Sequence, residues 1–502
     1  MAKRKRVDAA SNGQAGQEQP RKAAKAAGTS ELSKNDPGAV TIQIVTGSYE
    51  RVLHGFTATL SANPPGKDAA QKRQSDLSST VHFADTFLFQ AHTSAIRSLA
   101  LSPPTTADSS QPQTVILASG GSDDRINLYS LSMSPPVVSE RFPSISTLAG
   151  NKILENPSNR ELGTLLHHTS SITSLYFPSK SKLLSAAEDN TISVTRIRDW
   201  NVVSTVKAPQ PKTQGRPSGD TAPPGSVPCG INDFAVHPSM KLMISVGRGE
   251  RCMRLWNLMT GKKAGVLNFD REILQSVKET KRSTGEGRGI VWNSTGEEFA
   301  ITFEWGVVVF GVDSTPKCKA LPSPSTKVQQ VKFFDFSRNK DGSKELLVVS
   351  TDDGRAIFYS TGESSSPTDA SSIPDAKVIG QLGGKSSGLT GRVKDFEVLN
   401  LSNVGNWKKL FLLVTSSSDG VVRLWSLNFQ ATTKDAAQKG SEGDELSSQL
   451  LDSYETGNRI TCMVAFAMQK PREFEAIDES DFGSDSQDEE EEEESGSDSD
   501  RD

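Results

Sequence analysis

The sequence contains only four cysteines, and it has no long uncharged hydrophobic run. The cysteines are spread along the chain without a Cys-x-x-Cys pair, which argues against a disulfide framework or a zinc ribbon. No stretch reaches the length of about 18 uncharged apolar residues that a membrane-spanning helix needs, so we expect no membrane association. The first six residues are basic rather than apolar, so we do not expect a secretory signal peptide.

Motifs of common enzyme and cofactor sites are also missing. The chain has no phosphate-binding loop of the Gly-x-x-x-x-Gly-Lys-Ser/Thr type and no His-Glu-x-x-His. The glycine-rich segment 284–289 does not directly follow a strand pattern. The adjacent histidines His167 and His168 are expected to lie on a strand and to point to opposite faces, which disfavours metal chelation. We therefore predict no enzyme activity, catalytic residue, metal, cofactor or small-molecule substrate.

Negative charge is concentrated at the C-terminal end. The formal net charge is −5, but residues 473–502 hold sixteen acidic residues and one basic residue. Such a block repels itself and has little apolar surface to bury, so we expect residues 468–502 to be a disordered acidic tail. Serines beside acidic residues suit an acidophilic kinase, and the candidate phosphorylation sites are Ser484, Ser495, Ser497 and Ser499.

Positive charge is concentrated at the N-terminal end, in residues 1–39. Two basic clusters about 15 residues apart resemble a bipartite nuclear-import signal, which predicts a nuclear location for the protein. Their residues are Lys3, Arg4, Lys5, Arg6, Arg21, Lys22 and Lys25. The alternative is a generic basic arm that contacts nucleic acid or has no role. In either case we expect this arm to be disordered.

One unit recurs seven times between residues 40 and 467. A β-rich apolar run is followed by Ser or Thr, then an acidic residue about four positions later, and then an aromatic residue about six positions further on. The seven copies, some of them degenerate, lie at residues 46–56, 119–129, 185–195, 245–256, 304–310, 353–359 and 415–425. A repeat of this length that cannot bury both of its faces alone indicates a stacked or ring-shaped architecture.

Each unit reads as a β-hairpin whose Asp and Gly residues fit a tight turn, with an additional strand on either side. A unit of about four strands, repeated seven times, predicts an all-β, seven-bladed β-propeller. The first copy has no strand before its hairpin, whereas residues 457–466 form a strand pattern with no hairpin after it. We therefore expect these two ends to pair within one blade and to close a single domain over residues 40–467.

The units resemble the WD repeats of β-propellers, although the Trp-Asp dipeptide is absent from the expected places. In such repeats a His, the Ser or Thr, the turn Asp and the aromatic residue form a buried hydrogen-bonded set. The resemblance implies three sets, formed by His92, Ser119, Asp123 and Tyr129, by His168, Ser185 and Asp189, and by Thr415, Asp419 and Trp425. A catalytic relay uses similar residues. These trios recur once per repeat at structural positions, so we expect their polar groups to be hydrogen-bonded within the core and not to be catalytic.

Polar inserts lengthen every unit beyond the 40–45 residues that a bare repeat needs. We expect them to form loops on the rims, at residues 61–80, 103–114, 133–161, 207–228, 271–288, 361–376 and 430–446. Basic residues gather in and around the fourth hairpin and in later loops. These basic residues either form a positive rim that binds RNA phosphates or belong to an ordinary charged surface. Their positions are Arg248, Arg251, Arg254, Lys262, Lys263, Lys278, Lys281, Arg282, Arg288, Arg392, Lys394, Lys408 and Lys409.

Six segments resemble one particular family of WD-repeat proteins. They lie at residues 47–56, 167–173, 185–189, 237–242, 392–395 and 457–462, and they read, for example, Gly47-Ser48-Tyr49-Glu50 and Arg392-Val393-Lys394-Asp395. They are similar to the PAK-interacting-protein-like family, whose fungal members are called maintenance-of-killer proteins. The fourth hairpin departs from the pattern because it lacks the usual turn Asp and carries an extra residue.

The resemblance implies a nucleolar factor that assembles the large (60S) ribosomal subunit and takes part in pre-rRNA processing. The implied partners are pre-60S particles and a ribosomal-protein-L24-like assembly factor, with pre-rRNA as a further candidate. Animal members of the family are also described as inhibitors of a p21-activated kinase, so kinase regulation is the first alternative. A nuclear chromatin or ubiquitin-ligase adaptor is the second, because WD propellers serve there as well.

Overall fold

The computed structural model of the protein describes most of the repeat region. The described residues are 39–61, 80–105, 113–136, 145–146, 152–210, 230–280, 283–336, 345–364, 373–387, 389, 391–401, 411–430 and 445–469. The predicted basic arm, nuclear-import candidates, acidic tail and phosphorylation sites all lie outside these residues. In the part of the chain that is described, no helix is long and apolar enough to cross a membrane.

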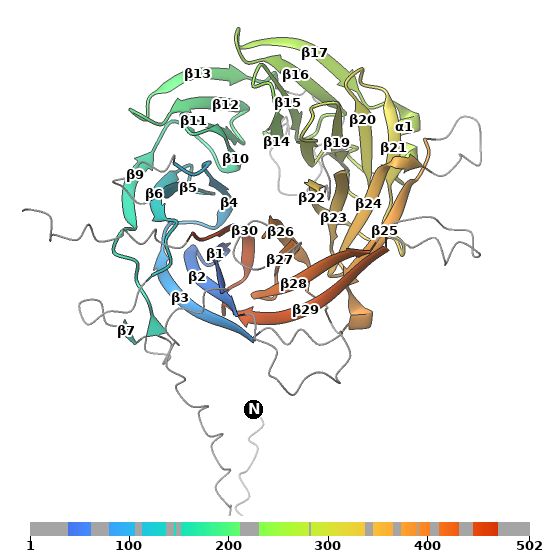
Figure 1. Ribbon diagram of the computed structural model, residues 1–502. Coiled ribbons are helices and arrows are strands. Elements are labelled where there is room, and N and C mark those ends of the chain that lie inside the picture. The colour runs from blue at the N-terminus through green and yellow to red at the C-terminus, as the bar shows by residue number, and fades with distance from the viewer. Residues whose placement is uncertain are drawn as a thin grey trace, which may run out of the picture. The chain divides into compact units, whose positions relative to one another are not determined.

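Seven sheets, each with a core of four antiparallel strands, follow one another around a ring, which confirms the predicted fold class (Figure 1). The sheet that contains both ends of the ring is the closing blade, made of β30 (Ile460–Ala467), β1 (Val40–Ser48), β2 (Val52–Ser61) and β3 (Thr80–Gln90). Blade 2 contains β4 (Ile96–Leu101), β5 (Thr114–Gly121), β6 (Ile126–Ser132) and β9 (Arg160–Leu165).

The other five blades each contain four strands that are consecutive in the chain. Blade 3 contains β10 (Ile172–Ser179), β11 (Lys182–Ala187), β12 (Thr191–Arg196) and β13 (Val202–Lys207). Blade 4 contains β14 (Ile231–Val236), β15 (Leu242–Gly247), β16 (Cys252–Asn257) and β17 (Lys262–Asn268). Blade 5 contains β18 (Gly289–Trp292), β19 (Glu298–Thr302), β20 (Val307–Gly311) and β21 (Pro316–Ala320). Blade 6 contains β22 (Val328–Asp335), β23 (Glu345–Thr351), β24 (Arg355–Ser364) and β25 (Ala376–Gly383). Blade 7 contains β26 (Val393–Asn400), β27 (Phe411–Ser417), β28 (Val421–Gln430) and β29 (Glu445–Glu455).

The ring is closed by pairing between β1 and β30. The two strands run antiparallel, from Ile42 opposite Ala467 to Ser48 opposite Ile460, with a bulge at the Gly47/Ser48 step. In Figure 1 the strand from the blue end of the chain lies beside the strand from the red end. Because β1 is paired on both sides, the N-terminal strand has no exposed edge that could pair with another molecule.

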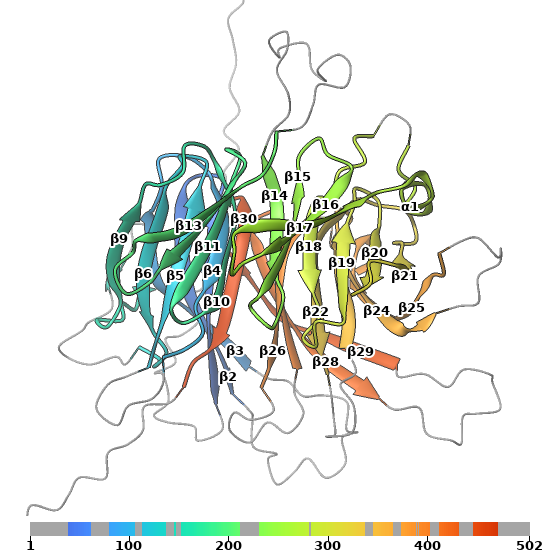
Figure 2. The same cartoon turned by 90° about the horizontal axis from the view of Figure 1, so that it is seen from above.

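All seven inner strands run in the same direction around the centre, which gives the ring two distinct faces. Side chains of one inner strand bond to the backbone of the next: Ser98 Oγ accepts from Leu175 N–H at 3.1 Å, and Asp395 Oδ2 accepts from Met463 N–H at 3.1 Å. We call the face where the inner strands begin the upper face and the face where they end the lower face. Figure 2 shows the ring edge-on, with the upper face and α1 (Arg271–Ser276) at the top.

The hydrophobic core consists of clusters that join neighbouring blades. Ile44 and Phe56 of the closing blade, for example, belong to the same cluster as Val414 and Leu424 of blade 7, and all four are fully buried. Each such side chain contributes roughly 1.5–3 kcal/mol by leaving water. The closing blade shares such clusters with blade 7 and with blade 2, so packing on both sides supports the closure in addition to the strand pairing.

Two of the predicted rim loops contain regular structure. Residues 271–288 include α1, whose Ile273 and Leu274 are buried against blades 4 and 5 together with Val277, so this insert is partly core. Residues 133–161 include β7 (Ile145–Ser146) and β8 (Lys152–Ile153), and β8 pairs in parallel with β3. Most residues of the other inserts lie outside the described part of the chain. A 3-10 turn, η1 (Lys385–Ser387), follows blade 6.

Candidate functional site

The His92 set joins the closing blade to blade 2. His92 precedes β4, and its Nδ1–H donates to Asp123 Oδ1 at 2.9 Å, while its Nε2 accepts from Ser119 Oγ at 2.8 Å. The phenol of Tyr129 also bonds to Ser119, and burial raises the pKa of Tyr129 to about 12. Burial raises the pKa of Asp123, but hydrogen bonds from Thr93 and His92 outweigh it and hold that pKa below its usual range.

The His168 set repeats this arrangement at the start of blade 3. Nδ1 of His168 donates to Asp189 at 3.1 Å and its Nε2 accepts from Ser185 Oγ at 2.8 Å. The hydroxyl of Thr191 also donates a hydrogen bond to Asp189, at 2.6 Å. In both sets the histidine, serine and aspartate are hydrogen-bonded to one another, as expected for polar groups satisfied within the core.

The expectation that the adjacent histidines point to opposite faces of a strand is wrong. Strand β9 ends at Leu165, so His167 and His168 lie in the following connection, where the alternation of a strand does not apply. Their rings are 4.6 Å apart, and His167 Nε2 also lies 3.1 Å from Ser185 Oγ. Burial and the neighbouring His168 lower the pKa of His167 to about 4.

Two blades replace the histidine set with a tryptophan bond. Trp425 Nε1 donates to Thr415 Oγ1 at 3.1 Å in blade 7, and Trp256 Nε1 donates to Ser245 Oγ at 2.8 Å in blade 4. Asp419 does not join Thr415 and Trp425. Instead it accepts from Arg423 at 3.2 Å, because no histidine precedes this blade to reach the turn.

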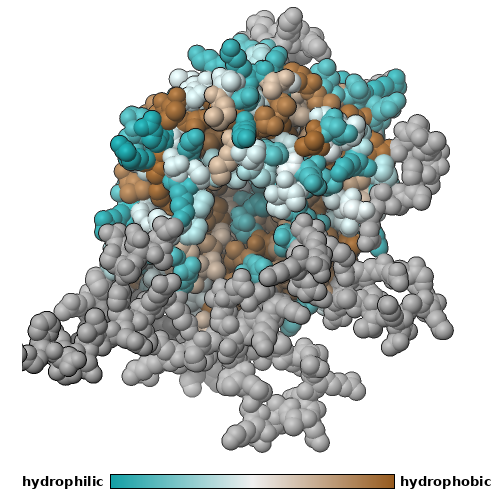
Figure 3. All heavy atoms as spheres, turned by 45° about the horizontal axis from the view of Figure 1, so that its top comes forward, coloured by the Kyte–Doolittle hydropathy of each residue, from teal (hydrophilic) through white to brown (hydrophobic). Residues whose placement is uncertain are grey.

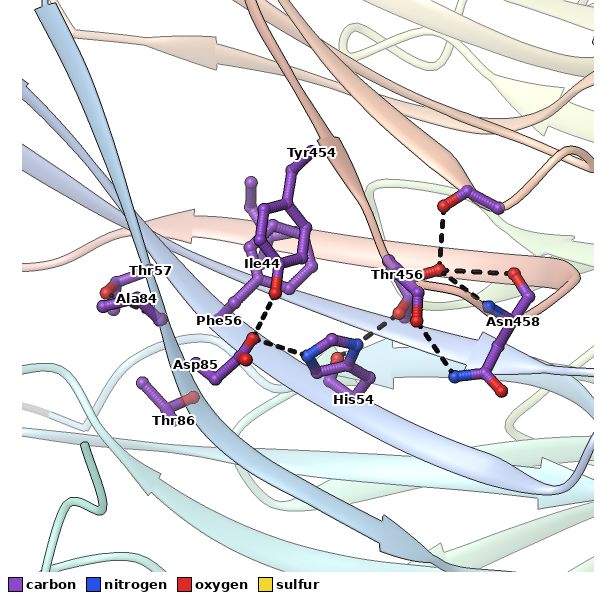
Figure 4. A network of polar contacts seen from close by, with 12 residues as sticks. Ile44, His54, Phe56, Thr57, Ala84, Asp85, Thr86, Tyr454, Thr456 and Asn458 are labelled. Carbon is purple, nitrogen blue, oxygen red and sulfur yellow. Dashed lines mark hydrogen bonds and ion pairs between the residues drawn. The ribbon is translucent and has the colours of Figure 1, made fainter. Parts of the chain in front are cut away.

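A further set in the closing blade has no counterpart in the repeat pattern (Figure 4). His54 Nε2 donates to Asp85 Oδ1 at 2.7 Å, and the Tyr454 hydroxyl from β29 of blade 7 donates to the same oxygen at 2.5 Å. Both His54 and Asp85 are buried. The set therefore links the closing blade to blade 7. The repeat pattern did not predict it, because Asp85 lies on the outer strand β3 and not in the hairpin turn where the pattern places an acidic residue.

The wall of the central channel carries charged side chains. Lys332 of β22 lies 2.6 Å from Glu397 and 3.5 Å from Asp395, both on β26. Asp233 of β14 accepts from Ile290 N–H at 3.0 Å, and burial raises its pKa to about 6. These contacts connect the inner strands of adjacent blades. In the described residues there is no cluster of three or more His, Cys, Asp or Glu side chains that could hold a metal ion.

The basic residues of the fourth hairpin are mostly engaged in local contacts. Arg254 is 9% exposed and forms a bidentate contact with Glu250, and Arg248 pairs with Glu188 at 2.9 Å. Arg251 donates to the carbonyl of Thr284 at 2.8 Å. These contacts favour an ordinary charged surface over an RNA-binding rim at this hairpin. Lys281, Arg282, Lys408 and Lys409 lie outside the described residues.

An exposed aromatic residue on the upper face is surrounded by arginines. Tyr49, in the β1–β2 turn, is 61% exposed, and the Arg459 guanidinium lies 5.6 Å above its ring. The backbone N–H of Arg459 donates to Glu50 Oε2 at 2.9 Å, which fixes the two turns together. Together with exposed Arg51, these residues form what we call the Tyr49 patch, whose members are Tyr49, Arg51 and Arg459.

Arg392 precedes β26 and pairs with Asp352, in the β23–β24 turn of blade 6, at 3.6 Å. Burial, together with the positive charges of Arg392 and Arg459, lowers the pKa of Lys394 despite the opposing effect of Asp352. Of the six family-like segments, residues 47–56 and 457–462 meet at the Tyr49 patch. Residues 392–395 adjoin β30, where Asp395 accepts from Met463 N–H. An exposed tyrosine among arginines is the composition typical of an energetically important protein-binding site.

Comparisons with known proteins agree with this architecture. The family described as "WD domain, G-beta repeat" matches residues 84–130 and 159–195. Protein MAK11 of Saccharomyces cerevisiae is 26% identical over 480 residues, covering 89% of this chain and 90% of that protein. The p21-activated protein kinase-interacting protein 1-like protein of Danio rerio is 22% identical over 86% of this chain and 82% of its own length.

A third relative is the Shk1 kinase-binding protein 15 of Schizosaccharomyces pombe, which is 23% identical over 87% of this chain and 88% of its own length. All three similarities extend over the whole ring rather than over single repeats. WD propellers typically act as non-catalytic scaffolds. The WD repeats and the similarity over most of the chain support the resemblance to the group of WD-repeat proteins that includes MAK11 and the p21-activated protein kinase-interacting protein 1-like proteins.

Proposed function

We propose that this protein is a non-catalytic scaffold for assembly of the large (60S) ribosomal subunit and for pre-rRNA processing. It acts in the nucleolus and docks pre-60S particles and ribosomal or ribosomal-like proteins, among them a ribosomal-protein-L24-like assembly factor. The described polar sets hold the ring together instead of meeting in a reactive cleft, which supports a docking role.

The Tyr49 patch is the proposed docking surface, and its position is the observation that carries the proposal. Two family-like segments that are remote in the chain, residues 47–56 and 457–462, meet there, and closure of the ring brings them together. The backbone of Tyr49 is fixed by the bond from its N–H to Arg459 O at 2.9 Å, so the turn that carries it is ordered before a partner arrives. Pre-ordering of this kind reduces the entropy lost on binding.

Kinase binding is the second candidate function. It is supported by the names of two relatives, the p21-activated protein kinase-interacting protein 1-like protein and the Shk1 kinase-binding protein 15. The same patch could serve it, because arginines and an exposed tyrosine suit many protein partners. The two functions therefore differ in the partner that is recovered, and not in the residues that bind it.

Affinity purification of the tagged full-length protein, with quantification of associated pre-rRNA and proteins, tests the proposal. We expect pre-60S components with the wild type and a loss of at least about thirtyfold with Tyr49→Ala/Arg459→Ala, since removing a hot-spot residue costs about 2 kcal/mol or more. Val312→Ala is the matched control, because Val312 is 66% exposed in the β20–β21 turn on the lower face. Equal recovery with all three proteins would exclude the Tyr49 patch, and recovery of a protein kinase without pre-rRNA would favour the second function.

A further inference from the structure

A hollow opens on the lower face where the inner strands of blades 3, 4 and 5 end. It has a volume of about 320 Å³, and its walls include Tyr176, His237, Met240 and Trp292. Tyr176 is 45% exposed and Met240 is 51% exposed, so apolar surface faces solvent at this place. The space is comparable to the small end of ligand pockets and is large enough for an aromatic side chain.

The walls of the hollow are fixed by the turns that form them. His237 Nδ1 accepts from Ser239 Oγ at 2.8 Å, and its Nε2–H donates to the carbonyl of Gly296 in blade 5 at 3.1 Å. The edge of the His237 ring meets the Trp292 ring at a centroid distance of 4.8 Å. The hollow is therefore a built feature between two blades and does not depend on a freely rotating side chain.

Basic side chains lie at the turns of the lower face on blades 3 and 4, the blades that provide most of the hollow. Six exposed lysines and arginines lie at or beside the turns of this end, namely Lys180, Lys182, Arg198, Lys241, Lys262 and Lys263. None of these six forms an ion pair within the described residues, which distinguishes them from the engaged arginines of the fourth hairpin. Figure 3 views the ring obliquely from this face and shows hydrophilic and apolar residues intermingled around a hollowed centre.

The chain leaves the ring on the same face. Strand β30 is an inner strand, so its last residue, Ala467, lies at the lower end together with the ends of β10, β14 and β18. The last described residues are held there, because Met468 N–H donates to Thr41 O and Gln469 N–H donates to Met133 O, both at 2.8 Å. The acidic tail therefore starts on the face that carries the hollow and the basic cluster.

The first part of the tail has the complementary chemistry. Residues 473–482 read Glu-Phe-Glu-Ala-Ile-Asp-Glu-Ser-Asp-Phe, with five acidic residues, no basic residue and two phenylalanines. An extended chain reaches up to about 17 Å from Gln469 to Phe474 and about 45 Å to Phe482, at roughly 3.3–3.6 Å per residue. Both phenylalanines can therefore lie well away from the point where β30 ends, and Phe482 has the longer reach.

We infer that residues 473–482 dock on the lower face of their own ring, with a phenylalanine in the hollow and the carboxylates on the surrounding basic cluster. The segment covers a cationic and apolar surface that would otherwise be open to other acidic partners, so an acidic peptide with an aromatic residue would have to displace it. This inference is independent of the proposed role in ribosome assembly.

Site-specific photo-cross-linking in the full-length chain tests this docking. A benzoylphenylalanine replaces Phe474 or Phe482, and digestion followed by mass spectrometry maps the products. We expect cross-links to peptides that contain Tyr176, Met240 or Trp292, with yields that fall several-fold in 1 M salt because exposed charges are screened there. The same group at position 49, on the upper face, is the control for non-specific reaction.

Charge-reversal variants distinguish docking of the tail segment on the basic residues from random encounters between the tail and the ring. Lys180→Glu/Lys241→Glu should reduce the cross-link yield at least fivefold, whereas Lys385→Glu on the upper face should leave it unchanged. Thermal unfolding of each variant verifies that the ring is intact. Cross-links that map away from β10, β14 and β18, yields insensitive to the double reversal, or products found only between isotopically light and heavy chains would each overturn the inference.

Discussion

Tyr454 donates its hydroxyl to Asp85, although the two residues are 369 positions apart in the chain. The bond crosses from blade 7 to the closing blade and shares its acceptor oxygen with His54. The ring of Tyr454 also stacks on Phe56 at a centroid distance of 4.4 Å. This side chain therefore connects the last complete blade to the blade in which the two ends of the chain meet.

Removing that hydroxyl should weaken the ring at its closure. Tyr454→Phe retains the stacked ring but deletes a hydrogen bond to a buried carboxylate, so we expect the free energy of unfolding to fall by about 1.5–3 kcal/mol. Urea unfolding of the full-length protein measures the change. Tyr49→Phe, at an exposed position, should alter stability by less than about 0.5 kcal/mol. Equal losses in the two variants would show that the Asp85 bond does not support closure.

Acid should destabilise the protein partly through His167. The folded protein holds the pKa of His167 at about 4, below the ordinary value near 6.5, because of burial and the neighbouring His168. Between these two pH values the unfolded chain binds a proton that the folded chain refuses, so this contribution to stability is lost as the pH falls from about 6.5 to 4. Allowing for partial exposure and screening, its size is about 1 kcal/mol.

Chemical unfolding at several pH values isolates this contribution. We expect His167→Asn to reduce the fall in stability between pH 6.5 and pH 4 relative to the wild type. His82→Asn, which changes an exposed histidine of β3, is the control and should retain the wild-type slope. If His167→Asn also retained that slope, the histidine would not be the responsible group.

Gly420 lies at the tightest turn next to the closing segment. Its φ is +85°, and a Cβ atom at this position would lie 2.7 Å from the carbonyl oxygen of Asn458. Gly420→Ala should therefore lower stability by about 1–3 kcal/mol through backbone strain and displacement of residues 456–459. Gly362→Ala is the matched control, because nothing lies within 4 Å of its added Cβ atom. Thermal unfolding compares the two, and indistinguishable midpoints would contradict the close packing of this turn.

The architecture could be predicted from the sequence because each hairpin has a local pattern. Residues such as Asp123 and Asp189 mark turns four positions after a Ser, and this spacing does not depend on any distant part of the chain. The half-units at the two ends likewise indicated the pairing that joins Ile42 to Ala467. Repetition made the prediction robust, since a degenerate copy such as residues 304–310 could be recognised from its position between clearer ones.

Contacts between distant segments could not be predicted in the same way. Asp85 belongs to an outer strand, and nothing near it in the sequence indicates that Tyr454 lies opposite. The helix α1 could not be recognised from the sequence, because Ile273, Leu274 and Val277 are the only apolar residues in a polar insert. His167 was misjudged because the end of β9, which decides its direction, is set by the strand's pairing partners rather than by its own residues.

Sedimentation of the tagged full-length protein through a sucrose gradient, with rRNA and protein identification across the fractions, tests the proposed role most directly. We predict that the protein migrates with pre-60S particles and that Tyr49→Ala/Arg459→Ala moves it toward the top of the gradient. Migration of the wild-type protein in a low-mass complex with a protein kinase, without precursor rRNA, would contradict a role in large-subunit assembly.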